Sequence, residues 1–382
     1  MTRFAQIAAA IAVVASAACS YPPAGASGNR LVLASQGHFF VGGEYTKTKD
    51  GQIRAGQMYV QFQVPANRTQ AYPVVMWHGG NQTGTNFTGT PDGRSGWADE
   101  FLQRGYAVYV VDQPGRARSG YFGEAYGPTR RPDAASMQLR FTAPERANLY
   151  PQARLHTQWP GTGTAGDEIF DQFFSSQVED MQDLALMERL NRDAGIALLE
   201  RIGAAILLTH SQSGPFGWAL ADARPSLVKG ILAIEPNGPP FYENTVVGPP
   251  DWFRDGAVGR TWGITRNALT FSPAVTDANA LKRARQVSST GAALVRCWLP
   301  VSPAPQLPNL RGIPILIVTG EASYHAPYDH CTAAFLEQAG VTTAFVRLAD
   351  VGIRGNGHMM MLEKNNLEIA AFLDDWVREH VN

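Results

Sequence analysis

The sequence has no block of like charges. Its 32 lysine and arginine residues nearly balance its 33 aspartate and glutamate residues, which leaves a formal net charge of −1. Because nucleic-acid binding requires a basic footprint, this composition excludes a nucleic-acid partner and favours a small neutral or mixed-charge one. Internal repeats are also lacking. With 382 residues, 45% of them hydrophobic, the chain can bury a large core and is expected to form one enlarged domain.

Cysteine is scarce, with only Cys19, Cys297 and Cys331. None of them stands in a C-x-x-C spacing or in a zinc-type Cys/His cluster, although His330 adjoins Cys331, so metal binding is disfavoured. We expect neither a metal nor a cofactor. If Cys19 is lipidated or removed, an oxidising compartment would allow Cys297 and Cys331 to form a disulfide. Two unconnected buried thiols are the alternative.

Long apolar runs are scarce at the N-terminus too, where "IAAAIAVVASAAC" is too short to cross a bilayer as a stable helix. We interpret residues 1–18 as a signal peptide and the protein as exported, either secreted or periplasmic. The segment ending at Cys19 resembles a bacterial lipobox, although Ser16 stands where a larger aliphatic residue is usual. A lipid anchor on Cys19, the only membrane contact we expect, and simple cleavage at an Ala-x-Ala site are both open. Residues 19–35 would then be a tether.

From residue 36 to residue 382, apolar runs alternate with segments of helical spacing. "QMYVQFQVP" is typical of an antiparallel strand. "PVVMWHG" and "YAVYVVDQPG" flank the helical "SGWADEFLQRG", which indicates a βαβ unit with a right-handed crossover. Further buried strands are expected in "VKGILAIEPNG", "IPILIVTGE" and "TTAFVRL", with a last helix over 365–380. The pattern predicts a three-layer α/β domain, with a mostly parallel sheet covered by helices on both faces.

Two long segments interrupt the alternation, at about 121–176 and 237–310. Both are irregular and aromatic, and long irregular insertions in a compact domain usually serve as lids or walls. No strongly amphipathic lid helix stands out in 237–310. We therefore expect a walled, largely apolar pocket rather than a mobile interfacial lid.

The stretch "AAILLTHSQSGPFG" indicates a strand, a sharp turn and a helix, the setting of a nucleophile elbow. Ser211 ends the apolar run, and its surroundings read T-H-S-Q-S instead of the usual G-x-S-x-G. Ser213 is the competing serine, but it lies in the following segment, where it would be buried or would cap a helix. We expect Ser211 to be the nucleophile.

This elbow, the pair His78-Gly79, "PDGRSGW", "VVDQPGRARS" and a late Gly-x-Gly-His together resemble the α/β-hydrolase fold, and within it secreted bacterial and fungal esterases with a Ser-Glu-His triad. The resemblance implies a carboxylic ester hydrolase acting on a small-molecule ester. An epoxide hydrolase or haloalkane dehalogenase would need aspartate at position 211. The alternatives are a lipase and a catalytically silent binding protein of the same fold.

In the resembled family the triad follows the order serine, acid, histidine. The resemblance implies His358 as the base, in "RGNGHMMM" after the last strand. The acid position that is usual for the fold holds Ser323. Glu235 ends the strand "GILAIE", which carries the acid in Ser-Glu-His esterases, and we expect it to orient the histidine. Glu321 and then Asp329 are the alternatives.

The resemblance also implies an oxyanion hole made by the backbone N–H groups of Gly80 and Gln212. Arg116 and Arg118 follow another strand and would either contact an acidic substrate or hold their loop, the second being favoured.

Other histidines are expected to have less direct functions. His78 and His210 flank core strands and are interpreted as structural, whereas His325 and His330 lie on a loop and could line the pocket.

Overall fold

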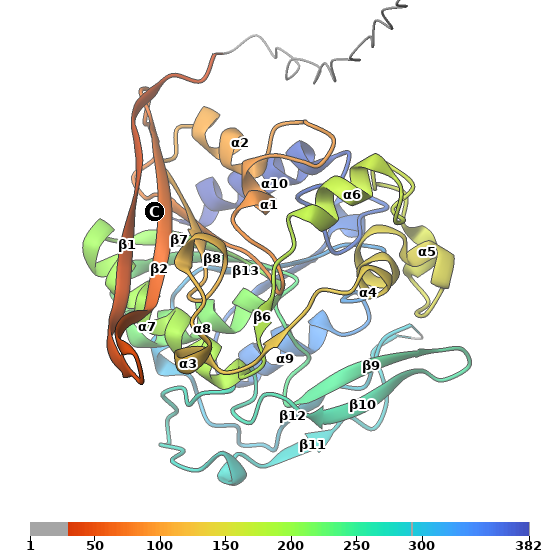
Figure 1. The fold of residues 1–382 in the computed structure, drawn as a ribbon. Helices are drawn as coiled ribbons and strands as arrows, with labels where there is room; N and C mark the ends of the chain where they lie inside the picture. Colours follow the sequence, from red (N-terminus) through yellow and green to blue (C-terminus); the bar gives the residue numbers. More distant parts are fainter. Residues whose placement is uncertain (1–29, 292, 382) are drawn as a thin grey trace, which may run out of the picture.

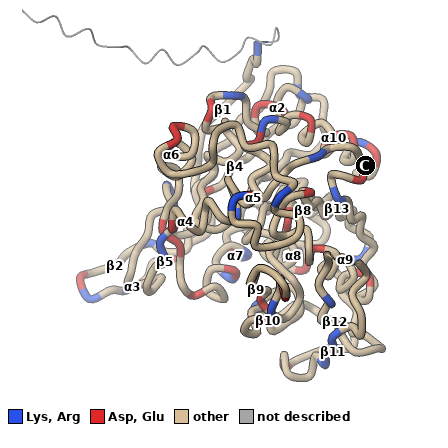
Figure 2. Tube along the Cα trace, turned by 90° about the vertical axis from the view of Figure 1, so that its right-hand side faces the viewer, with Lys and Arg blue, Asp and Glu red and all other residues tan. Residues whose placement is uncertain are grey.

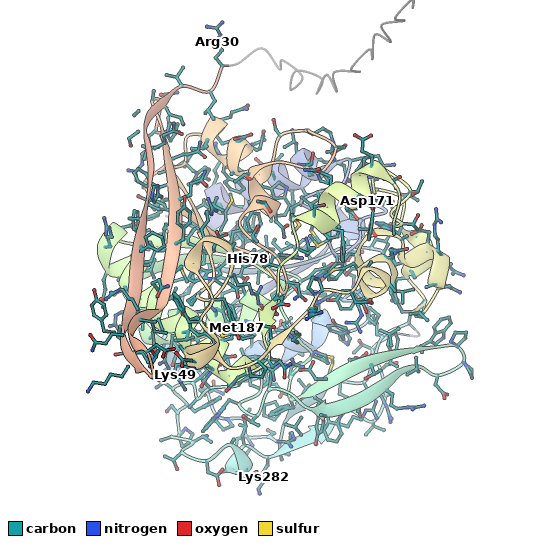
Figure 3. All side chains as sticks on the ribbon, in the orientation of Figure 1. Arg30, Lys49, His78, Asp171, Met187 and Lys282 are labelled. Carbon is teal, nitrogen blue, oxygen red and sulfur yellow. A yellow bond between two sulfur atoms is a disulfide. The ribbon has the colours of Figure 1, made fainter. Side chains whose placement is uncertain are left out.

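The computed structural model describes residues 30–291 and 293–381. The expected signal peptide and Cys19 lie outside the described residues, as does most of the expected tether. The first strand begins at Leu33, so the domain starts slightly earlier than residue 36. Charged residues such as Lys49 and Lys282 lie at the periphery and His78 lies inside, between closely packed side chains (Figure 3).

A single large sheet organises the domain (Figure 1). Its strand order is β1-β2-β4-β3-β7-β8-β13-β14. In that order the strands are β1 (Leu33–Thr48), β2 (Gly51–Pro65), β4 (Val108–Asp112), β3 (Val74–Trp77), β7 (Ala205–His210), β8 (Val228–Ile234), β13 (Ile315–Thr319) and β14 (Ala344–Arg347). The pairs β1–β2 and β2–β4 are antiparallel, and all pairs from β4 to β14 are parallel. The mostly parallel sheet predicted from the sequence is confirmed.

Helices cover both faces of this sheet. The principal ones are α2 (Trp97–Gln103) and α10 (Asn366–His380) on one face, and α7 (Leu184–Ile202), α8 (Gly214–Ala223) and α9 (Asp329–Gln338) on the other. Successive strand residues point to opposite faces. In β3, Val75 and Trp77 pack on the α7–α8 side, whereas Val74 and Met76 pack on the α10 side. The architecture is therefore the three-layer arrangement expected from the sequence.

The first insertion consists of short elements laid over the carboxyl edge of the sheet. After η1 (Ala117–Ser119) they are α3 (Gly123–Tyr126), β5 (Thr129–Arg130), α4 (Ala134–Met137), the π-helix η2 (Gln138–Thr142), α5 (Pro144–Ala147), η3 (Ala153–Leu155), α6 (Glu168–Ser175) and β6 (Asp180–Met181). In Figure 1, α4, α5 and α6 lie together on one side of the sheet.

The second insertion is built from small antiparallel sheets. Its elements are β9 (Tyr242–Gly248), β10 (Trp252–Val258), η6 (Ala278–Ala280), β11 (Arg283–Arg285), β12 (Trp298–Pro300) and η7 (Pro308–Leu310). β9 pairs with β10 and β11 with β12. Apart from residue 292, which is not described, the segment 237–310 contains no α-helix, in line with the absence of a lid-helix pattern in its sequence.

Short elements complete the loops around the core. They are α1 (Thr85–Thr88), η4 (Ser211–Ser213), η5 (Pro225–Leu227) and η8 (Leu348–Val351).

A disulfide joins Cys297, in the second insertion, to Cys331 in α9, with an S–S distance of 2.03 Å. Of the two possibilities that the sequence left open, the structure has the paired form. Among the described helices, none is both long and apolar enough to span a membrane.

Candidate active site

Ser211 stands on a strained turn at the carboxyl end of β7. Its φ is 55°, in the left-handed region that residues other than glycine seldom adopt. The turn continues through η4 into α8. The backbone carbonyl of Ser211 accepts a 2.8 Å hydrogen bond from the N–H of Asn237, in the loop after β8. The side chain is thus presented at the edge of the sheet where the strands end, as in a nucleophile elbow.

The turn at Ser211 forms without the usual glycines because neighbouring residues supply the space. The buried hydroxyl of Ser213 accepts a hydrogen bond from the His210 N–H and donates one to the Trp77 carbonyl, both at 2.8 Å. Thr209 is accommodated by Gly217 of α8, where a Cβ would lie only 3.1 Å from the Thr209 methyl group. Ser213 is therefore a structural residue that ties the elbow to β3, as its position in the sequence suggested.

His358 and Glu235 meet at this edge of the sheet. His358 follows η8 and precedes α10, whereas Glu235 directly follows β8. The Nδ1 atom of His358 lies 2.5 Å from the Oε2 atom of Glu235, and both side chains are fully buried. In the described part of the chain, the Nε2 atom of His358 has no hydrogen-bond partner. This contact leaves Nε2 of His358 available to accept a proton.

Ser323 supports this carboxylate from the position where the fold usually carries its acid. Its hydroxyl donates to the Oε2 atom of Glu235 at 2.6 Å, and the N–H of Gly320 donates to Oε1 at 2.7 Å. The other candidate acids have other partners. Glu321 binds Arg354 at 2.9 Å, and Asp329 binds His325 at 2.9 Å. Of the three acids considered from the sequence, Glu235 is the one hydrogen-bonded to His358.

Burial governs the protonation of this pair. It lowers the pKa of His358 well below the usual value, and the neighbouring rings of His210 and His325 and the charge of Arg140 act in the same direction. Burial, together with Asp329, raises the pKa of Glu235 above its ordinary range, against the opposing donors from Ser323 and Gly320. At neutral pH the histidine is therefore the free base that a general base must be.

Aromatic rings enclose His358. The ring centroids of Phe141, Tyr324 and His325 lie 5.0, 4.8 and 4.7 Å from its centroid. Burial raises the pKa of Tyr324 well above its usual value, and Ser211 is among the neighbours of this tyrosine. The sequence analysis missed Phe141 and Tyr324, and the one available signal was that Tyr324 directly follows the position where the fold usually carries its acid.

The loop after β3 approaches the elbow closely. A Cβ built on Gly79 would lie 3.0 Å from the Ser211 Cβ, so a larger residue would displace the serine. A Cβ on Gly80 would lie 3.5 Å from the side-chain amide of Gln212. In the described residues, the backbone N–H of Gly80 makes no hydrogen bond. The two residues expected to form the oxyanion hole are thus neighbours, and the loop that carries Gly80 lies close to Ser211.

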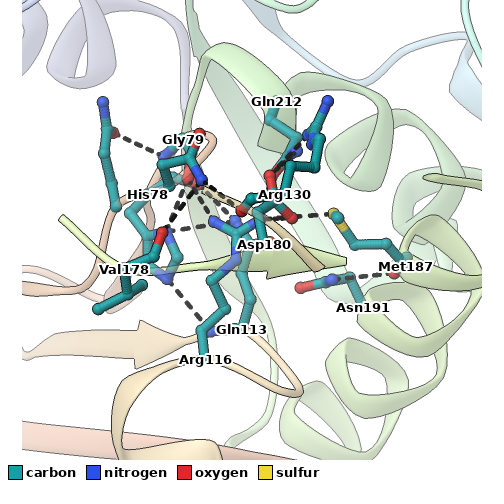
Figure 4. A network of polar contacts seen from close by, with 12 residues as sticks. His78, Gly79, Gln113, Arg116, Arg130, Val178, Asp180, Met187, Asn191 and Gln212 are labelled. Carbon is teal, nitrogen blue, oxygen red and sulfur yellow. Dashed lines mark hydrogen bonds and ion pairs between the residues drawn. The ribbon is translucent and has the colours of Figure 1, made fainter. Parts of the chain in front are cut away.

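A buried polar network fixes these two residues (Figure 4). Arg116, only 2% exposed, donates to the Gly79 carbonyl at 2.9 Å and to the Gln212 side-chain oxygen at 2.6 Å. It also pairs with Asp180, which accepts a further bond from Gln212 at 3.0 Å. Burial alone would raise the pKa of Asp180, but Arg116 and Arg130 hold it below the usual value. Arg116 therefore has the structural function favoured from the sequence.

Arg118 also has a structural partner, since it binds Asp112 at 2.6 Å and its guanidinium stacks on Tyr59.

The remaining histidines have structural surroundings. Buried His78 accepts a hydrogen bond from the backbone N–H of Gln113, and buried His210 lies with Nε2 3.0 Å from the His358 carbonyl. Burial, the largest cause, lowers the pKa of His78 to about 4 and that of His210 to about 3. His325 stacks on His358 inside the site, whereas the Nε2 atom of His330 lies 3.3 Å from the Cys297 sulfur, beside the disulfide.

The loop that carries His358 is anchored to the first insertion. His156 bridges Glu145 at 3.0 Å and Glu363 at 2.8 Å. Glu363 in turn accepts the Gly357 N–H at 2.8 Å, next to His358. Although burial opposes it, the two carboxylates raise the pKa of His156 to about 9. The sequence analysis missed these contacts because Glu145 and His156 lie in an irregular segment and Glu363 is 207 residues from His156.

Among residues 30–291 and 293–381, two groups of side chains have the composition of a metal site. Cys297, His330 and Cys331 form one, but both sulfurs are joined in the disulfide. Glu235, His325 and His358 form the other, but the Glu235 oxygens already accept from Gly320, Ser323 and His358.

A serine on a strained turn after a central strand, a histidine–carboxylate pair beside it and a mostly parallel sheet define an α/β-hydrolase. A model of the alpha/beta hydrolase family matches residues 74–372, and the chain belongs to this family. It is similar to the "Probable secreted lipase phiG" of a fungal species (strain ATCC 74256), with 44% identity over 346 residues and 89% of each chain covered. The solved structure of a bacterial esterase shares the fold, with a TM-score of 0.62 and 22% identity over 93% of this chain and 98% of that one.

Proposed function

We propose that the protein is an exported serine hydrolase that cleaves carboxylic esters through an acyl-enzyme on Ser211. The observation that carries the proposal is the buried 2.5 Å contact between His358 and Glu235, with the free Nε2 atom of His358 in the same site as the elbow. In the proposed triad, Ser211 is the nucleophile, His358 the base and Glu235 the acid.

Each residue of the proposed triad and oxyanion hole takes part in a defined step of ester hydrolysis. As the Ser211 oxygen attacks the ester carbonyl carbon, His358 Nε2 takes the hydroxyl proton, and Glu235 stabilises the imidazolium. The backbone N–H groups of Gly80 and Gln212 donate to the oxyanion. The C–O bond to the alcohol breaks, and His358 returns the proton to the leaving oxygen. Water, deprotonated by His358, then attacks the acyl carbon; the bond to the Ser211 oxygen breaks, His358 returns the proton to that oxygen, and the carboxylic acid is released.

Small and medium soluble esters fit the site best. The proposed base is enclosed by the rings of Phe141 and Tyr324, and aromatic walls favour compact substrates. A lipase is the second candidate, because the fungal relative bears that name. The described part of 237–310 offers antiparallel hairpins where a lipase would need a lid helix, which favours an esterase.

Export is part of the proposal. It is supported by the apolar N-terminal run, by the word "secreted" in the relative's name and by the disulfide, since disulfides persist in oxidising compartments. Whether Cys19 carries a lipid is a separate expectation that mass spectrometry of the mature protein can decide.

A panel of p-nitrophenyl esters of graded chain length tests the proposal. We expect hydrolysis with the highest kcat/KM for short acyl chains, and its loss in Ser211→Ala. Ser213→Ala serves as the matched control and should retain substantial activity after its folding is verified. A wild-type protein that is folded, hydrolyses no ester and reacts with no serine-directed probe would be the silent binding protein instead.

A further inference from the structure

The π-helix η2 lies directly over the candidate active site. π-helices are rare and often mark functional sites, and this one brings Arg140 and Phe141 to the proposed triad. Phe141 stacks on His358 with an interplanar angle of 28°. The guanidinium carbon of Arg140 lies 5.8 Å from the centre of the Tyr324 ring. Because Ser211 is also a neighbour of Tyr324, Arg140 is separated from the proposed nucleophile by one tyrosine ring.

Arg140 is exposed and has no ion-pair partner among the described residues. Other arginines of the same insertion do have one: Arg130 pairs with Asp180 and Arg131 with Glu179. Among nearby acids, Asp133 accepts from a backbone N–H at the start of α4, and Glu145 binds His156. Figure 2 shows basic segments beside α5. Within the described part of the chain, the positive charge of Arg140 beside Tyr324 therefore has no matching negative charge.

This charge opposes the proposed chemistry unless something neutralises it. Proton transfer from Ser211 creates an imidazolium on His358, and the positive charge of Arg140 disfavours that cation. An anionic group on the bound substrate would pair with Arg140 and remove the repulsion. A guanidinium that lies over a ring, as Arg140 does, still has N–H groups available for a carboxylate.

We propose that Arg140 recognises a carboxylate on the substrate. The inference rests on the proposed function and narrows its substrate class. The carboxylate should be separated from the scissile ester carbonyl by about the length of one aromatic ring or a short aliphatic chain. Aryl esters that carry a ring carboxylate and half-esters of short dicarboxylic acids both meet this requirement.

A matched pair of substrates tests the proposal. 4-Acetoxybenzoate is anionic at neutral pH, whereas 4-acetoxybenzamide has nearly the same shape and is neutral. We expect the wild-type ratio of kcat/KM, anionic over neutral, to exceed one and to fall as salt concentration rises. Arg140→Gln should lower that ratio roughly two- to fivefold, the range of an exposed ion pair. Arg140→Lys should retain part of the preference and Arg140→Glu should reverse it.

Arg154→Gln is the control, because Arg154 is another exposed arginine of the same insertion and has no ion-pair partner in the described chain. It should leave the ratio unchanged.

A ratio that Arg140→Gln does not change, or that Arg154→Gln lowers equally, would overturn the assignment to Arg140. If the wild type hydrolyses 4-acetoxybenzamide without any Arg140-dependent preference, the proposed esterase function stands and only the carboxylate site fails. If it hydrolyses neither compound nor p-nitrophenyl acetate, the proposed function itself fails.

Discussion

Replacing Glu235 by glutamine tests the proposed acid most sharply, because three donors converge on its two oxygens. His358 and the hydroxyl of Ser323 donate to Oε2, and the N–H of Gly320 donates to Oε1. Glutamine has one oxygen and one NH₂ group, so one of these contacts must become a donor–donor contact. If the NH₂ group faces His358, the imidazole must place its proton on Nε2, the atom that has to accept the Ser211 proton.

The opposite amide orientation keeps the correct tautomer but sets the NH₂ group against the Gly320 N–H. A buried donor without an acceptor costs about 1–3 kcal/mol, so the productive orientation is populated at roughly 1–20%. Loss of the carboxylate charge removes a charge-assisted hydrogen bond to the imidazolium, a further factor of about 10–100. Together these effects predict a decrease in kcat of roughly 10²- to 10⁴-fold, the scale that a wrong histidine tautomer causes.

The assay is steady-state hydrolysis of a short p-nitrophenyl ester, with circular dichroism and thermal unfolding as the folding controls. Glu321→Gln is the matched variant, since Glu321 binds Arg354 and the Gly355 N–H instead of His358. It should change kcat less than about threefold, as substitutions away from the reacting groups do. If Glu321→Gln or Asp329→Asn loses more activity than Glu235→Gln while remaining folded, the reasoning is refuted.

Three other predictions follow from the same structure. Because burial lowers the pKa of His358 and a protonated base is inactive, kcat/KM should fall only below about pH 6.5, the ordinary histidine value; an acid limb centred above it would contradict this. His156 has a pKa of about 9 in the fold, so its contribution, roughly 3 kcal/mol, should be complete below about pH 6.5 and lost as pH rises through about 9. Chemical denaturation across this range should show the loss in the wild type but not in His156→Gln. Activity should not jump when a long-chain ester passes its solubility limit, and a sharp rise with emulsified triglyceride would identify a lipase.

Much of the scaffold could be predicted from the sequence because periodicity reports burial. The runs around β3, β4, β7, β8, β13 and β14 are apolar since these strands are covered on both faces, and the structure has strands in all of them. The start of the domain was less accurate. β1 is an edge strand with mostly exposed or half-buried residues, so its first residues carry little hydrophobic signal and were assigned to the tether.

The acid could not be decided from local pattern alone, because its identity depends on which carboxylate reaches His358 in space. Glu235 and His358 are 123 residues apart, and only the fold brings their strands' ends together. The contribution of Ser323 was hidden for the same reason. In the sequence, a serine at position 323 means only that the usual acid position lacks a carboxylate. In the structure, the Ser323 hydroxyl donates a hydrogen bond to Glu235.

The contacts made by the insertions were the least predictable. Arg140, Phe141 and His156 lie in an irregular segment without a repeating pattern, and their partners Tyr324, His358 and Glu363 are far along the chain. Loop conformation, which decides these contacts, is set by individual turns and caps rather than by periodicity.

The most direct test of the central claim is to locate the adduct of a fluorophosphonate probe by peptide mass spectrometry. If Ser211 is the nucleophile activated by His358 and Glu235, the probe should modify Ser211 stoichiometrically. Labelling should be abolished in Ser211→Ala and slowed by roughly 10²-fold or more in Glu235→Gln. An adduct on Ser213, or the absence of any adduct on a folded protein that still hydrolyses esters, would contradict the account.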